Sequence, residues 1–417
     1  MPRQLSERVF LLLIGAVQCV NILDFMMVMP LGPDFAAAFG VPNSRLGLLG
    51  ASYTLAAAAS GIAGSFFLDR FDRRKALAVT LAGLVVSTAL GGLVESFDTM
   101  LASRCAAGLF GGPASALALA IVSDVIPPER RGRAMGAVLG AFAVASVFGV
   151  PVGLELAHLG DWRTPFFAVA TLAALVAALA VALLPPLVGH LALRHERPAT
   201  LRSMLARREV VLALTANAVV MLGHFALVPN LAAYFQFNFG YPREDMGLLY
   251  FGGGLISLGT MRLAGHLADR IGPPLVATGA TVAYIAILFF SYIVPLYGFP
   301  VLLLFAGFMV TSSFRAVPMR ALASRVPNPA ERARYMSTQS AIDHIAAAGG
   351  ALLGAHLLRE LPGGRLEGMD SLGWVTIALS ATVPGLLFLV ERRVRSREHR
   401  PIEAHSATSV APAGPGG

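Results

Sequence analysis

The sequence predicts an all-α membrane protein whose twelve transmembrane helices form two pseudo-symmetric six-helix bundles. The chain is 56% hydrophobic and only 13% charged. Apolar runs long enough to cross a bilayer recur along it, and two local patterns repeat at an offset of about 200 residues, which indicates a duplicated unit. A duplicated membrane bundle is typically built to rock around a site between its halves.

The composition indicates that lipid, rather than water, surrounds most of this chain. Soluble domains carry about 25% charged residues, whereas the mean hydropathy here is +0.69. A soluble core could not hide so much apolar surface. A membrane β-barrel would instead show alternating segments of about ten residues, and the sequence has no such pattern.

Each apolar run can cross the hydrocarbon layer, which is roughly 30 Å thick, as a helix that rises about 1.5 Å per residue. The first run resembles a signal peptide, but it is long and lacks a small-residue cleavage site, so we interpret it as the first span. The predicted spans are 9–37, 46–67, 76–93, 100–122, 135–156, 164–184, 210–237, 246–267, 275–294, 301–322, 336–358 and 373–390.

Two patterns carry the duplication. Asp69-Arg70 recurs 200 positions later as Asp269-Arg270, and both pairs end an apolar run. The segment 131–135 is echoed by 332–336. We therefore predict an N-terminal six-helix bundle (1–187), a polar cytoplasmic linker (188–208), a C-terminal six-helix bundle (209–392) and a disordered cytoplasmic tail (393–417) that has little to bury.

The net charge of +8 could indicate a nucleic-acid binder, but the distribution of the 32 Lys and Arg residues favours another interpretation. Most of them lie at the N-terminus, in the loops on its side and in the tail. This bias follows the positive-inside rule, so both termini are expected in the cytoplasm and the chain in the inner (plasma) membrane. Nucleic acid is not an expected partner. The opposite loops hold only Arg45, Arg163, Arg243, Arg359 and Arg365.

The loop after the second span carries a family resemblance. It keeps Asp69, Arg70, Arg73 and Arg74 of the pattern G-x-x-x-D-R-x-G-R-[KR], and it departs at Ser65 and Asp72, where glycine is usual. This pattern is the hallmark of the major facilitator superfamily, which the chain resembles. The second copy at 265–272 fits the first eight positions of the pattern and departs from it at 273–274.

Further motifs resemble the twelve-span drug:proton antiporters and sugar-efflux-like permeases of that family. They lie at 24–33, 101–108, 128–133 and 149–153, the last with its proline displaced. The resemblance implies alternating access. It also implies a cytoplasmic latch, because a carboxylate at a helix end can pair with arginines of neighbouring loops; the alternative is a simple topology anchor. The latch residues would be Asp69, Arg70, Arg73, Arg74, Arg131, Arg133, Asp269 and Arg270.

Ionisable groups inside spans cost roughly 2.5–3.5 kcal/mol at the helix centre, so each one needs a reason. Gln18, Asn21 and Asp24 are three residues apart and share one helix face, which we expect to line a water-accessible cavity. Arg104 lies at a similar depth and could pair with Asp24, so that a proton on the carboxylate would release the arginine.

His224 lies 200 positions after Asp24, in the equivalent span. We expect the two to face each other across the pseudo-twofold axis as a proton-responsive pair; alternatively, His224 makes an ordinary helix–helix hydrogen bond. Arg315 and Asp343 could form an inner gate, a substrate contact or a structural pair. The predicted cavity also includes Tyr53, Asn217, Asn230, Tyr234 and His344.

The sequence has no phosphate-binding loop, no zinc-type cysteine spacing and no nucleophile–base arrangement, so we predict neither a cofactor, a resident metal nor an enzyme. The methionines at 26, 27 and 29 could bind soft metal ions, but adaptable hydrophobic binding explains them better and plain core packing better still. The prediction is a monomeric, proton-coupled exporter of a small, partly hydrophobic compound. The alternatives are an importer or facilitator of a sugar, organic acid or metal chelate, and a receptor or scaffold without flux.

Overall fold

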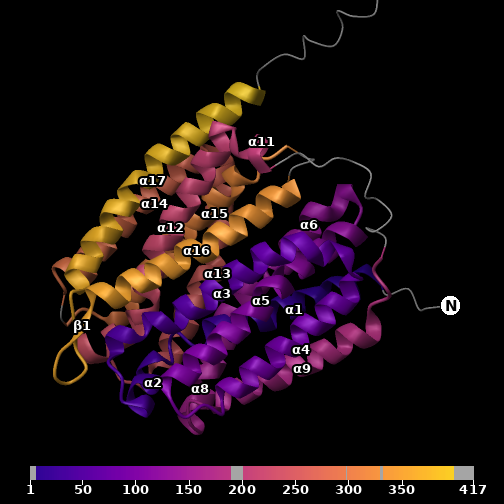
Figure 1. Cartoon of the computed structure of the whole chain (residues 1–417). Helices are drawn as coiled ribbons and strands as arrows, with labels where there is room; N and C mark the ends of the chain where they lie inside the picture. Colours follow the sequence, from indigo (N-terminus) through magenta and orange to yellow (C-terminus); the bar gives the residue numbers. More distant parts are fainter. Residues whose placement is uncertain (1–5, 189–200, 297, 329–331, 399–417) are drawn as a thin grey trace, which may run out of the picture.

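The computed structural model describes residues 6–188, 201–296, 298–328 and 332–398 of the 417-residue chain. It is a bundle of long helices that run roughly parallel or antiparallel to one another (Figure 1). The predicted all-α class is confirmed: in the described part the only strands are β1 (Arg359–Glu360) and β2 (Leu366–Glu367), a two-stranded antiparallel hairpin.

The first half of the chain supplies six long membrane-crossing elements. One of them, the fifth, is built from three consecutive helices and a π-helical segment, η3. The elements are α1 (Glu7–Met26), α2 (Gly32–Phe39), η1 (Asn43–Arg45), α3 (Gly47–Phe67), η2 (Leu68–Arg70), α4 (Arg73–Gly91), α5 (Phe97–Val125), α6 (Pro128–Leu139), α7 (Ala141–Val144), η3 (Ala145–Gly149), α8 (Val150–Leu159) and α9 (Thr164–Leu183).

The second half repeats this order. Its elements are α11 (Leu201–Leu205), α12 (Arg208–Ala233), η4 (Tyr234–Asn238), α13 (Met246–Ile271), α14 (Pro273–Leu288), η5 (Phe289–Ile293), α15 (Val301–Ala323), α16 (Arg332–Leu357) and α17 (Met369–Glu398). In the described residues, 10 stretches are long and apolar enough to cross a membrane. The helices α13 and α16, each of 26 residues, complete the bundle.

Three predicted boundaries differ from the structure. The first span does not run to residue 37: α1 ends at Met26 and α2 begins at Gly32, because Pro30 and Pro33 lack the N–H that would continue the helix. The linker contains α11, whose Met204 is fully buried. Helix α17 continues through 393–398, where a disordered tail was predicted.

Arginine side chains near the end of α17 fix that end of the helix through hydrogen bonds and an ion pair, and the composition of the segment did not indicate this. Arg397 donates hydrogen bonds to the backbone oxygens of Arg325 (2.8 Å) and Val326 (2.9 Å). Arg395 pairs with Glu391 one helical turn earlier, at 2.8 Å. Basic side chains also interact favourably with the C-terminal end of a helix.

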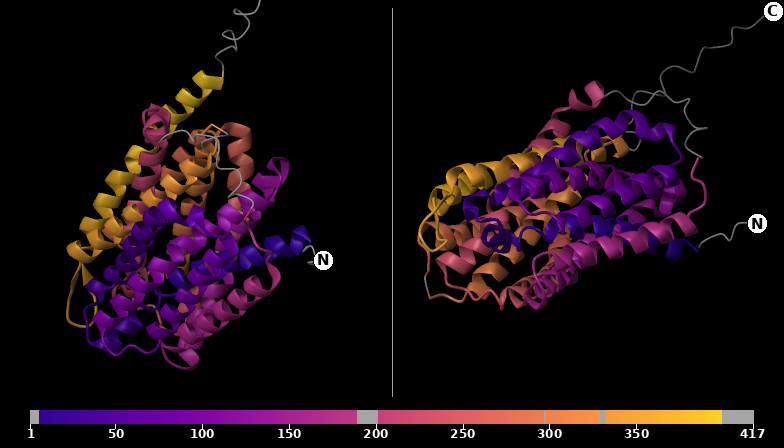
Figure 2. Two further views of the ribbon diagram at one scale, coloured as in Figure 1. Left: turned by 45° about the vertical axis from the view of Figure 1, so that its right-hand side comes forward. Right: turned by 60° about the horizontal axis from the view of Figure 1, so that its bottom comes forward.

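The helices gather into two groups, which Figures 1 and 2 show as an indigo-to-magenta half and an orange-to-yellow half. In the first half, α5 packs against α1, α3 and α4, and α9 packs against α1 and α4. In the second half, α12 packs against α16 and α17, and α15 packs against α13 and α14. The halves meet where α16 lies along α3 and where α13 lies along η3 and α8.

A pair of glycines four residues apart recurs in both halves and supports the duplication. Gly149 packs against Leu23 of α1, and a Cβ atom on it would lie 2.5 Å from the Leu23 Cδ1 atom. Its counterpart 201 positions later, Gly350, packs more closely, since a Cβ atom there would lie 2.2 Å from the backbone oxygen of Leu222 in α12. Small residues at this spacing let membrane helices approach closely.

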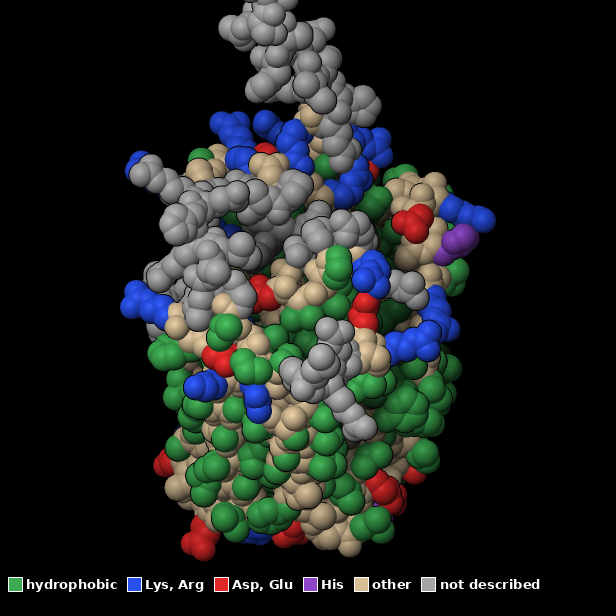
Figure 3. Space-filling view, turned by 90° about the vertical axis from the view of Figure 1, so that its right-hand side faces the viewer, with side chains coloured by type: hydrophobic (Ala, Val, Ile, Leu, Met, Phe, Trp, Pro, Cys, Tyr) green, Lys and Arg blue, Asp and Glu red, His purple; other side chains and the backbone are tan. Residues whose placement is uncertain are grey.

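The molecule has two ends of different charge. Figure 3 shows Lys and Arg side chains gathered at one end, above a broad band of hydrophobic side chains. We call this the basic end; α2 and the β1–β2 hairpin lie at the opposite end, which we call the far end. Exposed residues of the basic end include Arg70, Lys75, Arg130, Arg202, Arg208, Arg270, Arg325, Arg392, Arg393 and Arg395.

Polar contacts join the two halves at the far end. Arg243, in the loop before α13, donates two hydrogen bonds to the carboxylate of Asp34 in α2, of 3.0 and 2.6 Å. The backbone N–H of Asn43 donates to the Glu360 carboxylate beside the β1–β2 hairpin. These contacts hold the far end closed in this structure.

Candidate functional site

A ladder of polar contacts joins α1 to α5 inside the first half. The Gln18 amide donates to the Ser115 hydroxyl at 2.8 Å, and the Asn21 amide donates to the backbone oxygen of Gly111 at 3.0 Å. The third contact is the ion pair of Asp24 with Arg104. Because α1 and α5 run in opposite directions, the three rungs stay in register along the seam.

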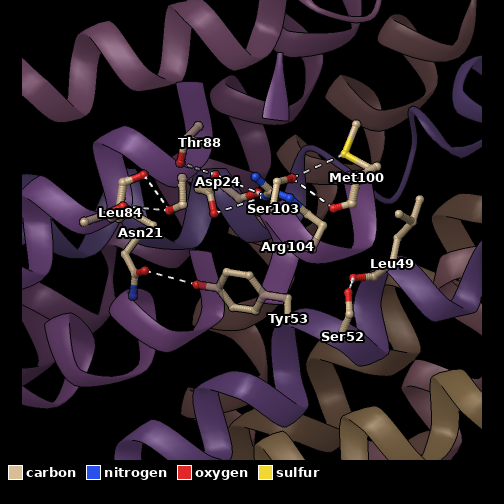
Figure 4. A network of polar contacts seen from close by, with 12 residues as sticks. Asn21, Asp24, Leu49, Ser52, Tyr53, Leu84, Thr88, Met100, Ser103 and Arg104 are labelled. Atoms are coloured by element: carbon tan, nitrogen blue, oxygen red, sulfur yellow. Dashed lines mark hydrogen bonds and ion pairs between the residues drawn. The ribbon is translucent and has the colours of Figure 1, made fainter. Parts of the chain in front are cut away.

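The Asp24 carboxylate is the most enclosed charge in this ladder. Its exposed fraction is 0%, and that of Arg104 is 1%. The Arg104 Nη1 atom lies 3.2 Å from Oδ1 and 3.3 Å from Oδ2 of Asp24, and the Thr88 hydroxyl donates to Oδ1 at 2.7 Å (Figure 4). The guanidinium also lies 5.1 Å from the ring centroid of Phe166. The contact predicted between Asp24 and Arg104 is therefore present, while its role in transport stays a prediction.

The polar face of α1 does not line a cavity in this structure, contrary to our expectation. Gln18, Asn21 and Asp24 are all buried, and each has a partner on α5. A glycine makes this possible: a Cβ atom on Gly111 would lie 2.3 Å from the Tyr53 hydroxyl and 2.7 Å from the Asn21 side-chain oxygen. Tyr53 is itself buried, and its hydroxyl donates to that same oxygen at 3.1 Å (Figure 4).

Three consecutive residues of α1 connect this interior to the rest of the molecule. Leu23 packs on Gly149 of η3, and Asp24 reaches α4 and α5. The Phe25 ring lies 5.0 Å from the Tyr53 ring on α3 and 5.8 Å from the Phe225 ring on α12 of the other half. A rotation of α1 at this level would therefore change contacts inside the first half and between the halves together.

The second half also contains a buried arginine, on the helix that corresponds to α5 but 211 positions after Arg104. Arg315 of α15 is 5% exposed; its guanidinium lies over the Tyr284 ring of α14 at 4.1 Å and donates to the Ser380 hydroxyl of α17 at 3.2 Å. The His224 ring of α12 stacks on the Phe308 ring of α15, with 5.6 Å between the ring centroids. Arg315 is near enough to interact electrostatically with that imidazole. The helices α12, α14, α15 and α17 correspond in order to α1, α4, α5 and α9.

Asp24 and His224 therefore do not face each other across the pseudo-twofold axis, which corrects our expectation. Each is directed into its own half, toward that half's buried arginine. The residues that meet across the interface are the next ones along the chain, Phe25 and Phe225. Two positions 200 residues apart, in corresponding helices, therefore need not lie opposite one another.

The expected contact between Arg315 and Asp343 is absent from the described residues, which corrects a second prediction. The Asn217 amide of α12 donates to the Asp343 carboxylate of α16, whereas Arg315 is directed toward α14 and α17. His344 is half-buried, and both side-chain amide atoms of Asn230 are buried without a partner in the described part. The Tyr234 hydroxyl donates to the Ser291 backbone oxygen at 2.7 Å, a contact within the second half.

The basic end shows part of the predicted latch. Arg73 is largely buried and pairs with Asp124 of α5 at 3.1 Å. Arg74 donates to the backbone oxygen of Val181. Arg70, Asp269 and Arg270 are exposed, and the side chains of Asp69, Arg131 and Arg133 lie outside the described part of the structure.

Sequence reasoning missed the two acidic residues that organise this end. Asp72 accepts hydrogen bonds from the backbone N–H groups of Arg74 (2.9 Å) and Leu187 (3.0 Å), so it caps α4 and holds the chain after α9. An aspartate directly before a helix is a recognised capping signal that could have identified it. Asp124, which pairs with Arg73, had no comparable signal.

Comparison with known proteins decides the family. Residues 14–316 match the model of the Major Facilitator Superfamily. The chain belongs to the major facilitator superfamily. Its fold agrees: the D-xylose-proton symporter has a TM-score of 0.74 at 16% identity, with 92% of this chain and 97% of that chain covered. A bacterial homologue of the human lysosomal transporter Spinster, in an inward-facing and unoccupied conformation, has a TM-score of 0.70 at 15% identity, covering 94% and 98%.

Two relatives are similar in sequence. The uncharacterized MFS-type transporter YceJ of Bacillus subtilis (strain 168) is 25% identical over 246 residues, which cover 58% of this chain and 61% of YceJ. The purine ribonucleoside efflux pump NepI of Shigella sonnei (strain Ss046) is 26% identical over 257 residues, covering 61% and 63%. Each match therefore spans about three fifths of the relative's length. Its family and its long apolar helices are those of a multi-pass membrane protein.

Proposed function

We propose that this transporter works by alternating access as a proton-coupled antiporter that exports a small, partly hydrophobic organic compound. The observation that carries the proposal is the fully buried Asp24–Arg104 pair with its Thr88 hydrogen bond. A carboxylate held in a dry interior beside a single arginine is the kind of group whose protonation changes the local charge balance.

The proton step follows from the charges. Unprotonated Asp24 neutralises Arg104, and the pair offsets part of the cost of removing both charges from water. A proton on Asp24 leaves the guanidinium as a buried, uncompensated cation, which is unfavourable. The half then relaxes by moving the arginine to another acceptor or by admitting water, and either response changes the packing of α1 against α5.

The movement reaches the interface between the halves through α1. Because Leu23 and Phe25 flank Asp24, a rotation that relieves Arg104 also shifts the contact with Gly149 and the ring contact with Phe225. Proton binding and the relative position of the halves are then linked energetically, as coupled transport requires.

The charge distribution supports an orientation in which the basic end faces the cytoplasm, with both termini there, in an inner (plasma) membrane. The contacts at the far end, Asp34 with Arg243 and Asn43 with Glu360, then close the outer side. The protein works as a monomer, because each half supplies its own buried polar network.

Export is favoured by the similarity to the purine ribonucleoside efflux pump. The alternative is proton-coupled import or facilitated uptake of a sugar, an organic acid or a metal chelate. The similarity to the sugar–proton symporter is at the level of the fold and does not decide the direction.

The test is flux in proteoliposomes with an imposed pH gradient and a pH-sensitive dye inside the vesicles. Adenosine and guanosine, as representative purine ribonucleosides, are the first probes, followed by a thermal-shift screen of hydrophobic compounds to find ligands. Antiport predicts that substrate and protons move in opposite directions. Co-directional movement would establish symport, and flux that ignores the gradient would contradict proton coupling.

A further inference from the structure

The interior of the second half holds a positive charge, on Arg315, that no carboxylate of the described residues neutralises. Arg315 is 5% exposed, yet its contacts in the described structure are the Tyr284 ring and the Ser380 hydroxyl. At the position where the first half has Asp24, the second half has His224. A buried cation is costly in a membrane protein unless an anion or a carboxylate accompanies it.

Two buried polar atoms of this site make no hydrogen bond of good geometry among the described residues. They are the Arg315 Nε atom and the Tyr284 hydroxyl, and that hydroxyl lies close enough to the guanidinium to interact with it. Arg104 also leaves Nε and Nη2 unpartnered, so unpartnered atoms alone do not separate the two arginines. The difference is that Arg104 has a carboxylate at 3.2 Å, whereas Arg315 has only neutral acceptors.

The site can be approached from the side of His224. Its imidazole is half-buried, and the adjacent Phe225 reaches the other half. A side chain on a helix leans toward the helix N-terminus, which places the Arg315 guanidinium over the preceding turns of α15. Phe308, on the same face of α15, contacts the rings of both His224 and Tyr284. A ligand entering beside His224 would therefore meet a flat aromatic wall and then the guanidinium.

We propose that Arg315, with the hydroxyls of Tyr284 and Ser380, binds an anionic group in the interior of the second half. The ligand is a carboxylate or an anion of similar size, since a guanidinium fork matches carboxylate geometry. If the anionic group belongs to the transported molecule, the inference rests on the proposed transport function and narrows the substrate to organic acids; an inorganic anion such as chloride does not depend on that function.

The test measures thermal unfolding of the purified full-length protein in detergent against increasing sodium chloride and, separately, sodium benzoate. A ligand that binds only the folded state raises the melting temperature in a saturable way. We expect saturation in the wild-type protein with at least one of the two salts. Saturation with benzoate alone would identify an organic carboxylate as the ligand class, and saturation with chloride alone an inorganic anion.

Variants locate the binding. Arg315→Gln removes the charge and should abolish the saturable rise, and His224→Asp supplies the second half with the carboxylate that the first half has. We expect His224→Asp to weaken anion binding at least tenfold while Arg315 stays in place, which keeps the test informative if Arg315→Gln fails to fold. Arg392→Gln removes an exposed arginine of the same half and serves as the matched control.

The outcomes are distinct from those of the flux experiment. The proposal is supported when the saturable rise is lost in Arg315→Gln and His224→Asp but kept in Arg392→Gln. It is overturned when neither salt gives a saturable rise in the wild-type protein, or when the rise survives in both site variants, which would place the anion elsewhere. A transporter without proton coupling could still pass this test, and a proton-coupled one could fail it.

Discussion

Each half of this protein buries an arginine on the fourth of its long helices, α5 or α15, but at a different level, and surrounds it differently. In the first half, Arg104 shares the interior with a carboxylate, a hydroxyl and an aromatic ring. In the second half, Arg315 has a hydroxyl and an aromatic ring but no carboxylate in the described structure. The helix packing of the halves is similar but their buried charges differ, which is why we propose proton binding for the first half and anion binding for the second.

The largest expected effect is on the carboxylate. Asp24→Asn leaves Arg104 buried and unpaired, which should lower the free energy of unfolding by about 3–5 kcal/mol and abolish the dependence of transport on the pH gradient. Asp370→Asn makes the same chemical change at an exposed position of α17 and should leave both quantities unchanged. If the Asp24→Asn protein still responds to the gradient, the titrating group lies elsewhere.

Double-mutant cycles should separate the halves directly. The coupling energy between Asp24→Asn and Arg104→Gln is expected to be roughly 1–3 kcal/mol, because the two residues share one ion pair. The coupling between His224→Gln and Arg315→Gln should be clearly smaller, since no ion pair joins these residues. Chemical unfolding of the four single and two double variants measures both. Equal coupling energies would contradict this expectation, because they would show that His224 interacts with Arg315 as strongly as Asp24 does with Arg104.

The paired glycines give a smaller contrast. Gly350→Ala brings a methyl group against the backbone oxygen of Leu222, which cannot move aside, whereas the methyl group of Gly149→Ala meets the side chain of Leu23. We expect Gly350→Ala to cost about 1–3 kcal/mol and Gly149→Ala less, as measured by thermal unfolding. Gly259→Ala, at a helix position with no atoms near the added carbon, is the control. A larger loss of stability for Gly149→Ala than for Gly350→Ala would contradict this expectation. It would mean that the helix packing around Gly350 adapts more easily to an added methyl group.

The smallest effect belongs to the far end. The carboxylate of Asp34 and the guanidinium of Arg243 are about one-quarter exposed, with exposed fractions of 26% and 25%, so Asp34→Asn should cost at most about 1 kcal/mol. The change should still favour opening of that end. Labelling of a cysteine introduced at Val228, beside the far-end contacts, would report the opening. Unchanged labelling would show that packing, rather than this ion pair, keeps the end closed.

Much of this architecture could be predicted from sequence because the bilayer imposes simple rules. Hydropathy located the long helices, the repeat identified the halves, and depth in the membrane brought Asp24 together with Arg104. Similar depth in the membrane also led us to expect a contact between Arg315 and Asp343, which was wrong. Two residues at one level can be directed toward different neighbouring helices. The direction of a helix face depends on how the helices pack, and Asn217, rather than Arg315, proved to be within reach of Asp343.

The polar face of α1 illustrates the same limit. Spacing placed Gln18, Asn21 and Asp24 on one face, and the cost of exposing them to lipid was assessed correctly. The sequence did not reveal that Gly111 lets α5 come close enough to satisfy them, since a glycine in a helix has many possible uses. The basic end was harder still, because its order depends on Asp72, a residue that departs from the family pattern.

The ladder between α1 and α5 has a consequence for how the chain enters the membrane during synthesis. Asp24 and Arg104 are separated by 80 positions, so α1 leaves the ribosome with its carboxylate and both amides unsatisfied. An aspartate at the centre of a lone helix costs roughly 2.5–3.5 kcal/mol to insert. We therefore expect α1 to stay beside the insertion machinery until α5 has emerged, and the first half to enter the lipid as a partly assembled group of helices.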